Sequence, residues 1–367
     1  MKEHKIAIYL YDIRKPYVGL GEMETSLATN IAQRARSLKE QYGLTFLFIV
    51  PAGMEGSFGP EVEYMKFGRL HEIVFKYRLL KPLSSLLFPK VDLVHWCQQM
   101  PKLHFRYSPY TLVTIHDINF IHNGIKEAKI RKRKRKLRRS LHQATHLSFI
   151  SHFTQQDVTS HFKITQPCRV ITNGVTDLSL LPAACDKPLP ADFLFHLSGL
   201  GKKKNAHLLV EMMRFLPHEH LVIAGKGSYT EEKLITDTID RYHLGNVSFI
   251  GLVTREEKAW LYGHCKAFLF PSLSEGFGLP VVEAMCFGKP TFISRLTSLP
   301  EVGGDVSPYF DALQPAAMAK VVAEGLAADA AAGDRKSQLV VQHSRLFDWG
   351  KAADEYIRYY LDILGIG

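Results

Sequence analysis

Two glutamates stand where a buried stretch of the sequence gives way to a helix. The segment FPSLSEGFGLPVVEAMCFGKP, residues 270–290, begins with apolar residues, breaks at 274–278 and then enters a predicted helix with a proline in its first turn. Glu275 lies in the glycine loop and Glu283 about one turn into the helix. A carboxylate in the loop can accept hydrogen bonds from sugar hydroxyls, and one in the helix from a second pair, such as those of a ribose. The alternative is a tight turn with two solvated glutamates.

Short apolar stretches that alternate with helical ones must position these glutamates. The predicted strands cover 5–11, 44–50, 92–96, 111–117, 146–151 and 169–175 in the first half and 193–199, 220–225, 247–251, 267–272 and 290–294 in the second. Such alternation predicts parallel sheets flanked by helices. A stretch with three prolines at 180–193 interrupts the series. We therefore predict two doubly wound α/β domains that face a cleft, residues 1–182 and 183–348, with ligands at the carboxyl ends of the strands.

The positive charge of the chain is confined to its first half. The 367 residues carry a net charge of +10, but residues 1–182 hold 27 Lys and Arg against 14 Asp and Glu, whereas the remainder holds 19 against 22. Ten of the cations lie between 126 and 139 in a predicted helix, and the densest part contains Arg131, Lys132, Arg133, Lys134, Arg135, Lys136, Arg138 and Arg139. This run is either a solvated helix face or a surface for phosphates on lipid head groups or an acidic acceptor. Nucleic acid is disfavoured, because no aromatic RNA-binding pattern, zinc finger or helix-turn-helix signature accompanies it.

Other classes of protein find no support in the sequence. There is no run of about 18 apolar residues that could span a membrane, and the apolar stretch at the start is too short for a secretion signal. The five cysteines are scattered without a CxxC pair, which indicates reduced thiols and no zinc cluster. No D-x-D motif and no clustered His, Asp and Cys occur along the chain. We therefore expect no metal site, no metal bridging a diphosphate and no cofactor.

Several segments occur together in an order that resembles one enzyme family. SEGFGLPVVEA resembles the E-x7-E signature of retaining GT-B glycosyltransferases of the family 4 type. The supporting segments are VTIHD (113–117), ISHFT (150–154), RVITNGV (169–175), KKKN (202–205), VIAGKG (222–227), NVSFIGLV (246–253) and LPEVGGD (299–305). The resemblance implies two Rossmann-like domains, with the nucleotide-sugar donor held mainly by the second and the acceptor mainly by the first. The closing helix, 349–364, would pack back on the first domain.

The resemblance also implies roles for single residues. Glu275 would contact hydroxyls of the transferred sugar, Glu283 would bind the ribose, and His116, followed by Asp117 at the end of its strand, would face the reacting sugar. The backbone N–H groups of Phe277, Gly278 and Leu279 would line the sugar and diphosphate. The remaining donor and loop positions are Lys203, Lys204, Gly225 and Gly227, with Gly19 and Gly21 near the diphosphate or the acceptor.

One position departs from the family pattern. The family places an Arg after a strand-end glycine and a Lys a few residues later, but this chain has SGLGKKKN, with Leu200 near the expected Arg. Lys204 matches the Lys, and Lys203 or Lys202 would replace the Arg. The leaving diphosphate gains charge in the transition state, so these cations matter for catalysis.

The sequence thus predicts a retaining, metal-independent glycosyltransferase. It would move a hexose from a UDP- or GDP-sugar to a cell-surface glycan or glycolipid such as lipopolysaccharide, from the cytoplasmic side of the cell membrane as a peripheral protein on anionic lipid. Two alternatives stay open: a synthase that acts on a soluble sugar acceptor, and a nucleic-acid-binding protein with a degenerate sugar site, which Leu200 keeps in consideration.

Overall fold

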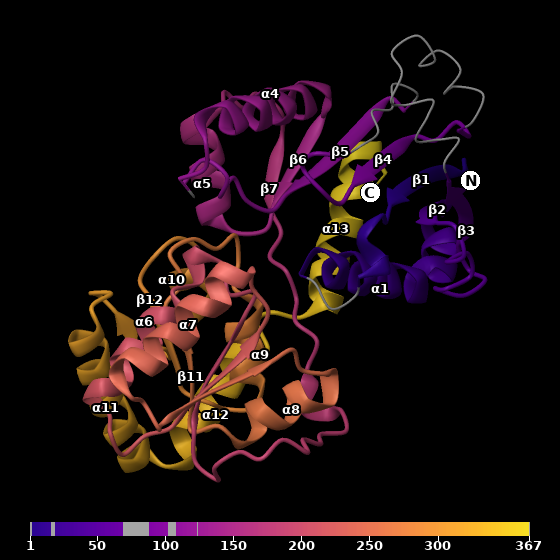
Figure 1. Cartoon of the computed structure of the whole chain (residues 1–367). Helices are drawn as coiled ribbons and strands as arrows, with labels where there is room; N and C mark the ends of the chain where they lie inside the picture. Colours follow the sequence, from indigo (N-terminus) through magenta and orange to yellow (C-terminus); the bar gives the residue numbers. More distant parts are fainter. Residues whose placement is uncertain (1, 16–18, 69–87, 102–107, 123, 367) are drawn as a thin grey trace. The chain divides into compact units, whose positions relative to one another are not determined.

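The computed structural model describes residues 2–15, 19–68, 88–101, 108–122 and 124–366 (Figure 1). The chain divides into two compact units, and each contains one parallel sheet. Unit 1 consists of Met1–Gly174 and Asp348–Gly367, and unit 2 of Val175–Phe347. Among the described residues, no helix combines the length and the apolar character needed to cross a bilayer.

Unit 1 is built on a seven-stranded sheet with the order β3-β2-β1-β4-β5-β6-β7. The strands are β1 (His4–Tyr9), β2 (Leu44–Pro51), β3 (Glu63–Phe67), β4 (Leu93–Trp96), β5 (Tyr110–Ile115), β6 (His146–Phe149) and β7 (Cys168–Val170). The flanking helices are η1 (Asp12–Arg14), α1 (Gly19–Tyr42), α4 (Glu127–Gln143), α5 (His152–His161) and α13 (Trp349–Leu364). Within the described residues, all neighbouring strands of this sheet pair in parallel.

Both faces of this sheet are covered, which explains its continuous apolar strands. Ile6 and Ile8 of β1 belong to a core shared with α1 and α13, whereas Ala7 and Tyr9 belong to a second core shared with α4 and α5. Helices α1 and α13 lie together on one side of the sheet and α4 lies on the other (Figure 1). Since successive side chains of a strand point to opposite faces, one strand supplies both cores.

A buried polar network fixes the closing helix α13 on the sheet. The Nδ1 and Nε2 atoms of His95 lie 2.7 Å from the Tyr360 hydroxyl and 2.8 Å from Thr114 Oγ1. Thr114 Oγ1 is also 3.1 Å from the hydroxyl of Tyr356. Burial disfavours the imidazolium form and lowers the pKa of His95 to about 3, so the ring is neutral at physiological pH.

Unit 2 is built on a six-stranded parallel sheet with the order β10-β9-β8-β11-β12-β13. The strands are β8 (Leu194–Ser198), β9 (Leu221–Gly225), β10 (Val247–Gly251), β11 (Ala267–Phe270), β12 (Thr291–Ser294) and β13 (Tyr309–Phe310). The helices are η3 (Leu178–Leu180), η4 (Lys202–Lys204), α6 (Ala206–Met212), η5 (Met213–Phe215), α7 (Tyr229–Tyr242), α8 (Arg255–His264), α9 (Leu279–Cys286), α10 (Leu299–Gly303), α11 (Pro315–Ala332) and α12 (Asp334–Ser344). Numbered within the unit, this is the order 3-2-1-4-5-6 of a Rossmann-like domain.

The structure confirms the two-sheet α/β fold and all eleven predicted strands, with ends shifted by a few residues. Two edge strands were missed. In β3, the two charged residues Glu63 and Lys66 are exposed and only Phe67 is buried, which is common at a sheet edge, and β13 spans only Tyr309–Phe310.

The boundary between the units lies earlier than the predicted one at residue 182. Gly174 closes unit 1, because it packs so tightly against the backbone of Trp349 that a Cβ atom would lie 2.3 Å from its nitrogen. Beyond it, η3 packs on α8 and α9 of unit 2, and Leu178 is buried there. The stretch at 180–193 is therefore a part of unit 2 and not the link between the units.

Candidate active site

In unit 2, the loops that follow two neighbouring strands carry a lysine and a glutamate that meet. Lys204 follows β8 and Glu275 follows β11, and these strands are neighbours where the strand order reverses. Such a switch point places two loops on either side of a crevice at the carboxyl ends of the strands. Lys204 Nζ donates to Glu275 Oε1 at 2.5 Å. The family resemblance implied both residues as site residues, and the fold brings them together.

The charge of Glu275 is maintained in a buried setting. Burial by itself raises the pKa of this carboxyl, but attraction to Lys204 and Lys203, and hydrogen bonds from Lys204 and Ser272, outweigh it and lower the pKa below its ordinary value. Ser272 Oγ lies 2.5 Å from Glu275 Oε1, and the Glu275 N–H donates to Thr297 Oγ1. The carboxylate is therefore ionised and oriented by residues of three loops. Ser272 and Thr297 were not found from the sequence, since hydroxyl residues in loops carry no distinguishing signal.

The lysine loop, residues 202–205 after β8, shows which cation can replace the expected arginine. Leu200 has a left-handed backbone (φ 46°) and its side chain is buried in the core of unit 2, so it contributes no group to the site. Lys203 acts electrostatically on Glu275, whereas Lys202 acts on Glu231 of α7. Of the two substitutes considered, Lys203 is therefore the cation nearer to the signature glutamate.

The lysine loop is also tied to the loop that carries Glu275. The Lys203 carbonyl accepts from the Leu273 N–H at 2.7 Å and from Ser272 Oγ at 3.1 Å. Asn205 donates to the Pro271 carbonyl from a left-handed backbone position (φ 54°). These bonds hold the two loops as one preorganised element.

Of the predicted glycines, Gly225 ends β9 and Gly227 lies in the loop between β9 and α7. A Cβ atom on Gly225 would lie 1.8 Å from the Ser198 carbonyl oxygen, and its φ of 130° also favours glycine. Gly227 N–H donates to Glu232 Oε1, and a Cβ atom there would lie 3.1 Å from Cβ of Leu200. Both glycines allow close backbone packing in the protein, and their predicted contact with the nucleotide stays a prediction.

The residues Phe277, Gly278 and Leu279 form the start of α9. Gly278 is the N-cap with a φ of 121°, and no side chain caps the helix. Ser298 Oγ donates to the Phe277 carbonyl at 2.9 Å and fixes the loop. A helix N-terminus without a side-chain cap can accept an anion such as a phosphate.

Glu283, the second signature glutamate, lies inside α9 and is buried. It accepts a hydrogen bond from Lys258 through Oε1 and one from the Tyr262 hydroxyl, 2.9 Å away, through Oε2. Lys258 and Tyr262 both belong to α8 and were not found from the sequence. The predicted binding of a ribose would use the remaining lone pairs of this carboxylate.

In unit 1, His116 follows β5 and is partly buried. Its Nε2 atom lies 2.6 Å from the Cys97 carbonyl oxygen, and because a carbonyl only accepts, Nε2 carries the proton and Nδ1 has the lone pair. Burial lowers the pKa of His116, against the raising effects of the Cys97 bond and of Asp117 and Asp12. The ring is thus neutral at physiological pH. Asp117 accepts from the Asn119 N–H through Oδ1, which matches the turn-capping role considered for it.

The two glycines predicted near the diphosphate or the acceptor, Gly19 and Gly21, both lie in the first turn of α1, and the structure explains why one of them is a glycine. A Cβ atom on Gly21 would lie 2.1 Å from the Lys15 carbonyl oxygen and 2.6 Å from that of Asp12, so only glycine permits this approach. Gly19 begins α1 and is exposed, and residues 16–18 lie outside the described residues. Nearby, Glu24 of α1 is fully buried and accepts from the Asp12 N–H, and burial raises the pKa of its carboxyl well above the ordinary value.

The predicted basic helix exists as α4, and its buried stripe is narrow. Leu137, Ser140 and Leu141 are buried, while seven of the eight predicted surface cations are exposed: Arg131, Lys132, Arg133, Arg135, Lys136, Arg138 and Arg139. Lys134 is half-buried. Arg131 pairs with Glu127 one turn earlier, and Lys136 donates to the Met100 carbonyl. Helix α4 therefore presents a dense positive surface on unit 1.

We expected no cluster of His, Asp and Cys side chains, and this expectation is wrong for the folded protein. His122, Asp157 and His161 lie with their ligand atoms within 4.8 Å of one another. The sequence gives no sign of this, because His122 and Asp157 come from segments that only the β5–β6 pairing brings together.

The fold and these loops define a two-domain α/β nucleotide-binding enzyme, and comparison with known proteins gives its family. Residues 37–177 match the model of "Glycosyltransferase Family 4" and residues 183–325 that of "Glycosyl transferases group 1". The chain belongs to the GT-B glycosyltransferases of the family 4 type.

Relatives and solved structures agree with this family. The chain is 24% identical over 384 aligned residues to the O-antigen chain mannosyltransferase B of Escherichia coli, which covers 97% of this chain and 99% of the relative. It is 32% identical to the serotype-specific mannosyltransferase WbdA of E. coli over 48% of this chain but only 22% of that longer relative. A sucrose-phosphate synthase from Thermosynechococcus elongatus has the same fold, with a TM-score of 0.77, 18% identity and coverage of 99% of this chain and 100% of that one. The structure of Anabaena HepE in complex with UDP and glucose matches with a TM-score of 0.71, 18% identity and coverage of 98% and 99%.

Proposed function

We propose that this chain transfers a hexosyl group, with mannose as the leading candidate, from a UDP- or GDP-sugar to a glycan acceptor of the lipopolysaccharide O-antigen type. The observation that carries the proposal is the Lys204–Glu275 pair at the switch point of unit 2. The full-length similarity to an O-antigen chain mannosyltransferase supports the sugar and the acceptor class.

The donor is assigned to unit 2. Glu275 is ionised and can accept hydrogen bonds from sugar hydroxyls through the lone pairs that Lys204 and Ser272 leave. The start of α9, which no side chain caps, offers N–H groups and a positive dipole end for the diphosphate. Lys203 and Lys204 add positive charge beside it, so negative charge that develops on the leaving group is stabilised without a metal ion.

The acceptor is assigned to unit 1. We expect His116 to face the transferred sugar in its neutral form, with the Nδ1 lone pair able to accept a hydrogen bond. The reaction would retain the anomeric configuration, with the acceptor attacking from the face that the diphosphate leaves. An oxygen of the departing diphosphate would then take the acceptor proton, and no carboxylate base is required.

The acceptor surface is assigned to α4. Its exposed cations match the phosphates of a glycolipid or of anionic lipid, so we expect a cytoplasmic protein that binds the inner face of the cell membrane peripherally. Nucleic acid is the less favoured partner of the same charges, because the chain belongs to a glycosyltransferase family and the sequence around the basic run carries no nucleic-acid-binding signature.

A transfer assay on the full chain tests this proposal. GDP-mannose, UDP-glucose and other UDP- and GDP-sugars are supplied with an O-antigen glycolipid or with a free oligosaccharide, and the anomeric linkage of the product is read by NMR. We expect transfer from one donor to the glycolipid with retention, a rate that added Mg²⁺ or Mn²⁺ leaves unchanged, and loss of at least about a hundredfold in kcat for Glu275→Gln.

Three other outcomes would each contradict one part of the proposed function. Equal rates on free oligosaccharide and glycolipid would support the synthase alternative, an inverted product would overturn the retaining mechanism, and an active Glu275→Gln variant would remove the assigned role of Glu275. Circular dichroism of this variant confirms that lost activity is not lost folding.

A further inference from the structure

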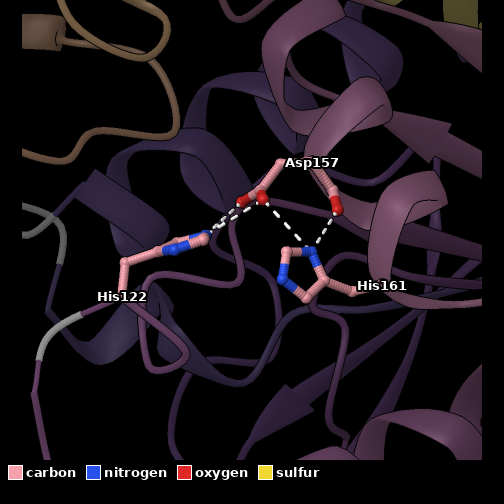
Figure 2. Close-up of side chains that lie close together, drawn as sticks. All are labelled: His122, Asp157 and His161. Atoms are coloured by element: carbon pink, nitrogen blue, oxygen red, sulfur yellow. Dashed lines mark hydrogen bonds and ion pairs between the residues drawn. The ribbon is translucent and has the colours of Figure 1, made fainter.

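Two histidines and one aspartate of unit 1 meet at the carboxyl edge of its sheet, whereas the residues assigned to the donor belong to unit 2. His122 lies in the turn after β5, and Asp157 and His161 lie one helical turn apart on α5. Figure 2 shows the Asp157 carboxylate between the two imidazole rings. Among the described residues, this is the one group of three metal-binding side chains whose ligand atoms come this close.

The distances in this cluster are close to those of a coordinated ion. His122 Nε2 lies 3.0 and 2.9 Å from the two carboxylate oxygens of Asp157, and His161 Nδ1 lies 3.4 Å from Asp157 Oδ1. Ligands at about 2.0–2.1 Å in a tetrahedron around Zn²⁺ are about 3.3 Å apart. The three ligand atoms lie within 4.8 Å of one another, so side-chain rotation must bring the more distant ones to this spacing.

The backbone on both sides of the cluster is held in place. Ile118 and Phe120 are buried in the core of unit 1, and the turn they form ends with the His122 N–H donating to the Asn119 carbonyl at 3.0 Å. Helix α5 is anchored by the buried Val158 and begins at Ser151, whose side chain accepts from the Thr154 N–H. The ligand positions are thus set by the fold and not by the ion, which lowers the entropic cost of binding.

The exposure of the three side chains fits an ion with an open coordination position. Asp157 is only 9% exposed, whereas His122 and His161 are 39% and 28% exposed. The carboxylate therefore lies at the buried end of the site, and solvent reaches the site from the side of the two imidazole rings. Two imidazole nitrogens and one carboxylate are ligands that Zn²⁺ accepts, with water in the fourth position.

Binding has a cost at each ring. His122 Nε2 carries a proton that it donates to the Asp157 carboxylate, and this proton must leave Nε2 when the ion binds there. In the ion-free arrangement, His161 Nδ1 lies 2.9 Å from the Asp157 carbonyl oxygen and 2.9 Å from Ser160 Oγ, so it carries a proton and donates to the carbonyl. A metal ion on this ring must replace that bond, worth about 1 kcal/mol. The attraction of a doubly charged cation to the Asp157 carboxylate opposes these costs.

We propose that His122, Asp157 and His161 bind a Zn²⁺ ion that clamps the loop after β5 onto α5. The same loop begins with His116, and the Thr154 hydroxyl of α5 already donates to the His116 carbonyl at 3.2 Å. The ion would add a second tie between the loop and the helix, six positions further along the loop. Its role is to hold the acceptor-side loop, and it takes no part at the diphosphate.

Zinc binding to the full-length chain tests the proposal. Free Zn²⁺ is titrated against a chromophoric chelator in the presence of wild type, His122→Gln, Asp157→Asn and His161→Gln. The matched control is His142→Gln, an exposed histidine on α4 outside the cluster. We expect one equivalent bound by the wild type and the control, and an affinity at least about tenfold lower in each cluster variant.

Two further measurements cover the geometry and the clamp. Co²⁺ in place of Zn²⁺ should give the intense visible absorption of a tetrahedral ion in the wild type and lose it in His122→Gln. Hydrogen exchange of the amides at 118–122 should slow when zinc is added to the wild type and stay unchanged in the variants. These readouts do not depend on transfer activity, so they stand whether or not the proposed reaction is correct.

Two results of the zinc titration would contradict the proposed zinc site. Equal zinc affinity in the wild type and all three cluster variants, or no stoichiometric binding at all, would show that the three side chains form only a hydrogen-bonded triad. If one variant fails to fold, as judged by circular dichroism, the other two and the cobalt spectrum of the wild type decide the question.

Discussion

Lys204 Nζ donates to Glu275 Oε1 at 2.5 Å, and this bond joins the loops that follow β8 and β11. Lys204 Nζ also lies 4.9 Å from the ring centre of Phe270, the last residue of β11. The lysine thus contacts both the end of one strand and the signature glutamate that follows it. Because both side chains are largely buried, the pair holds two opposite charges ready at the place where a sugar diphosphate is expected.

Removing only the lysine of this pair should destabilise unit 2. Lys204→Met leaves the Glu275 carboxylate buried with Lys203 as its remaining cation, and breaking a buried ion pair in this way costs about 3 kcal/mol. Urea unfolding followed by fluorescence measures the change, with Lys233→Met as the control. Lys233 and Asp237 form an exposed pair on α7, so the control should unfold at nearly the same urea concentration as the wild type. Similar losses in both variants would contradict the buried pair.

Acid should weaken unit 1 through His95. The pKa of this ring is about 3 in the folded state and near 6.5 when unfolded, so the unfolded chain binds more protons between these values and stability falls as the pH drops below about 6.5. The contribution of this one residue is about 2 kcal/mol between pH 7.5 and pH 5. Unfolding by urea at the two pH values should therefore give a smaller difference in His95→Gln than in the wild type.

The comparison between variants matters here, because other groups titrate in the same range. The raised pKa of Glu24 acts in the opposite direction, since its folded form prefers the proton and gains stability as the pH falls. Its contribution is the same in the wild type and in His95→Gln and cancels from their difference. An unchanged pH dependence in the variant would mean that His95 is not the buried neutral base described above.

Gly225 should not tolerate a side chain. In Gly225→Ala the new Cβ would lie 1.8 Å from the Ser198 carbonyl oxygen, and the φ of 130° adds backbone strain, so we expect a loss of 3 kcal/mol or more as an order of magnitude. Gly245→Ala is the matched control, because nothing lies within 4 Å of its Cβ position. Thermal unfolding of both variants checks this, and equal midpoints would contradict the close approach of β8 and β9.

The exposed cations of α4 should control binding to anionic vesicles. In the triple variant Lys132→Gln, Arg135→Gln and Arg139→Gln, three charges are removed at about 1 kcal/mol each, which lowers the partition coefficient roughly a hundredfold. Sedimentation with phosphatidylcholine vesicles, with and without phosphatidylglycerol, measures this at two salt concentrations. A control with Lys39→Gln, Lys90→Gln and Lys163→Gln removes the same charge from other exposed positions. If both variants bind alike, net charge and not α4 is responsible.

Much of the architecture was predictable because local sequence determines it. Buried parallel strands require continuous apolar residues on both faces, so the eleven predicted strands stand out between helical stretches. Glu275 and Glu283 were found because glycines, a proline and two carboxylates follow one another within a single segment. The edge strand β3 was missed because it carries exposed charges and only one buried residue, so nothing in its own residues separates it from a loop.

The partners of these residues were decided only by the tertiary structure. Lys258 and Tyr262 reach Glu283 because α8 packs beside α9, and Leu200 fills the core because a left-handed turn directs it inward. His122 and Asp157 meet because β5 and β6 are paired in register, which places the loop after one beside the helix after the other. Spacing along a chain identifies residues that share a turn or a helix. Contacts between loops depend on strand order, which is set by the packing of the whole sheet.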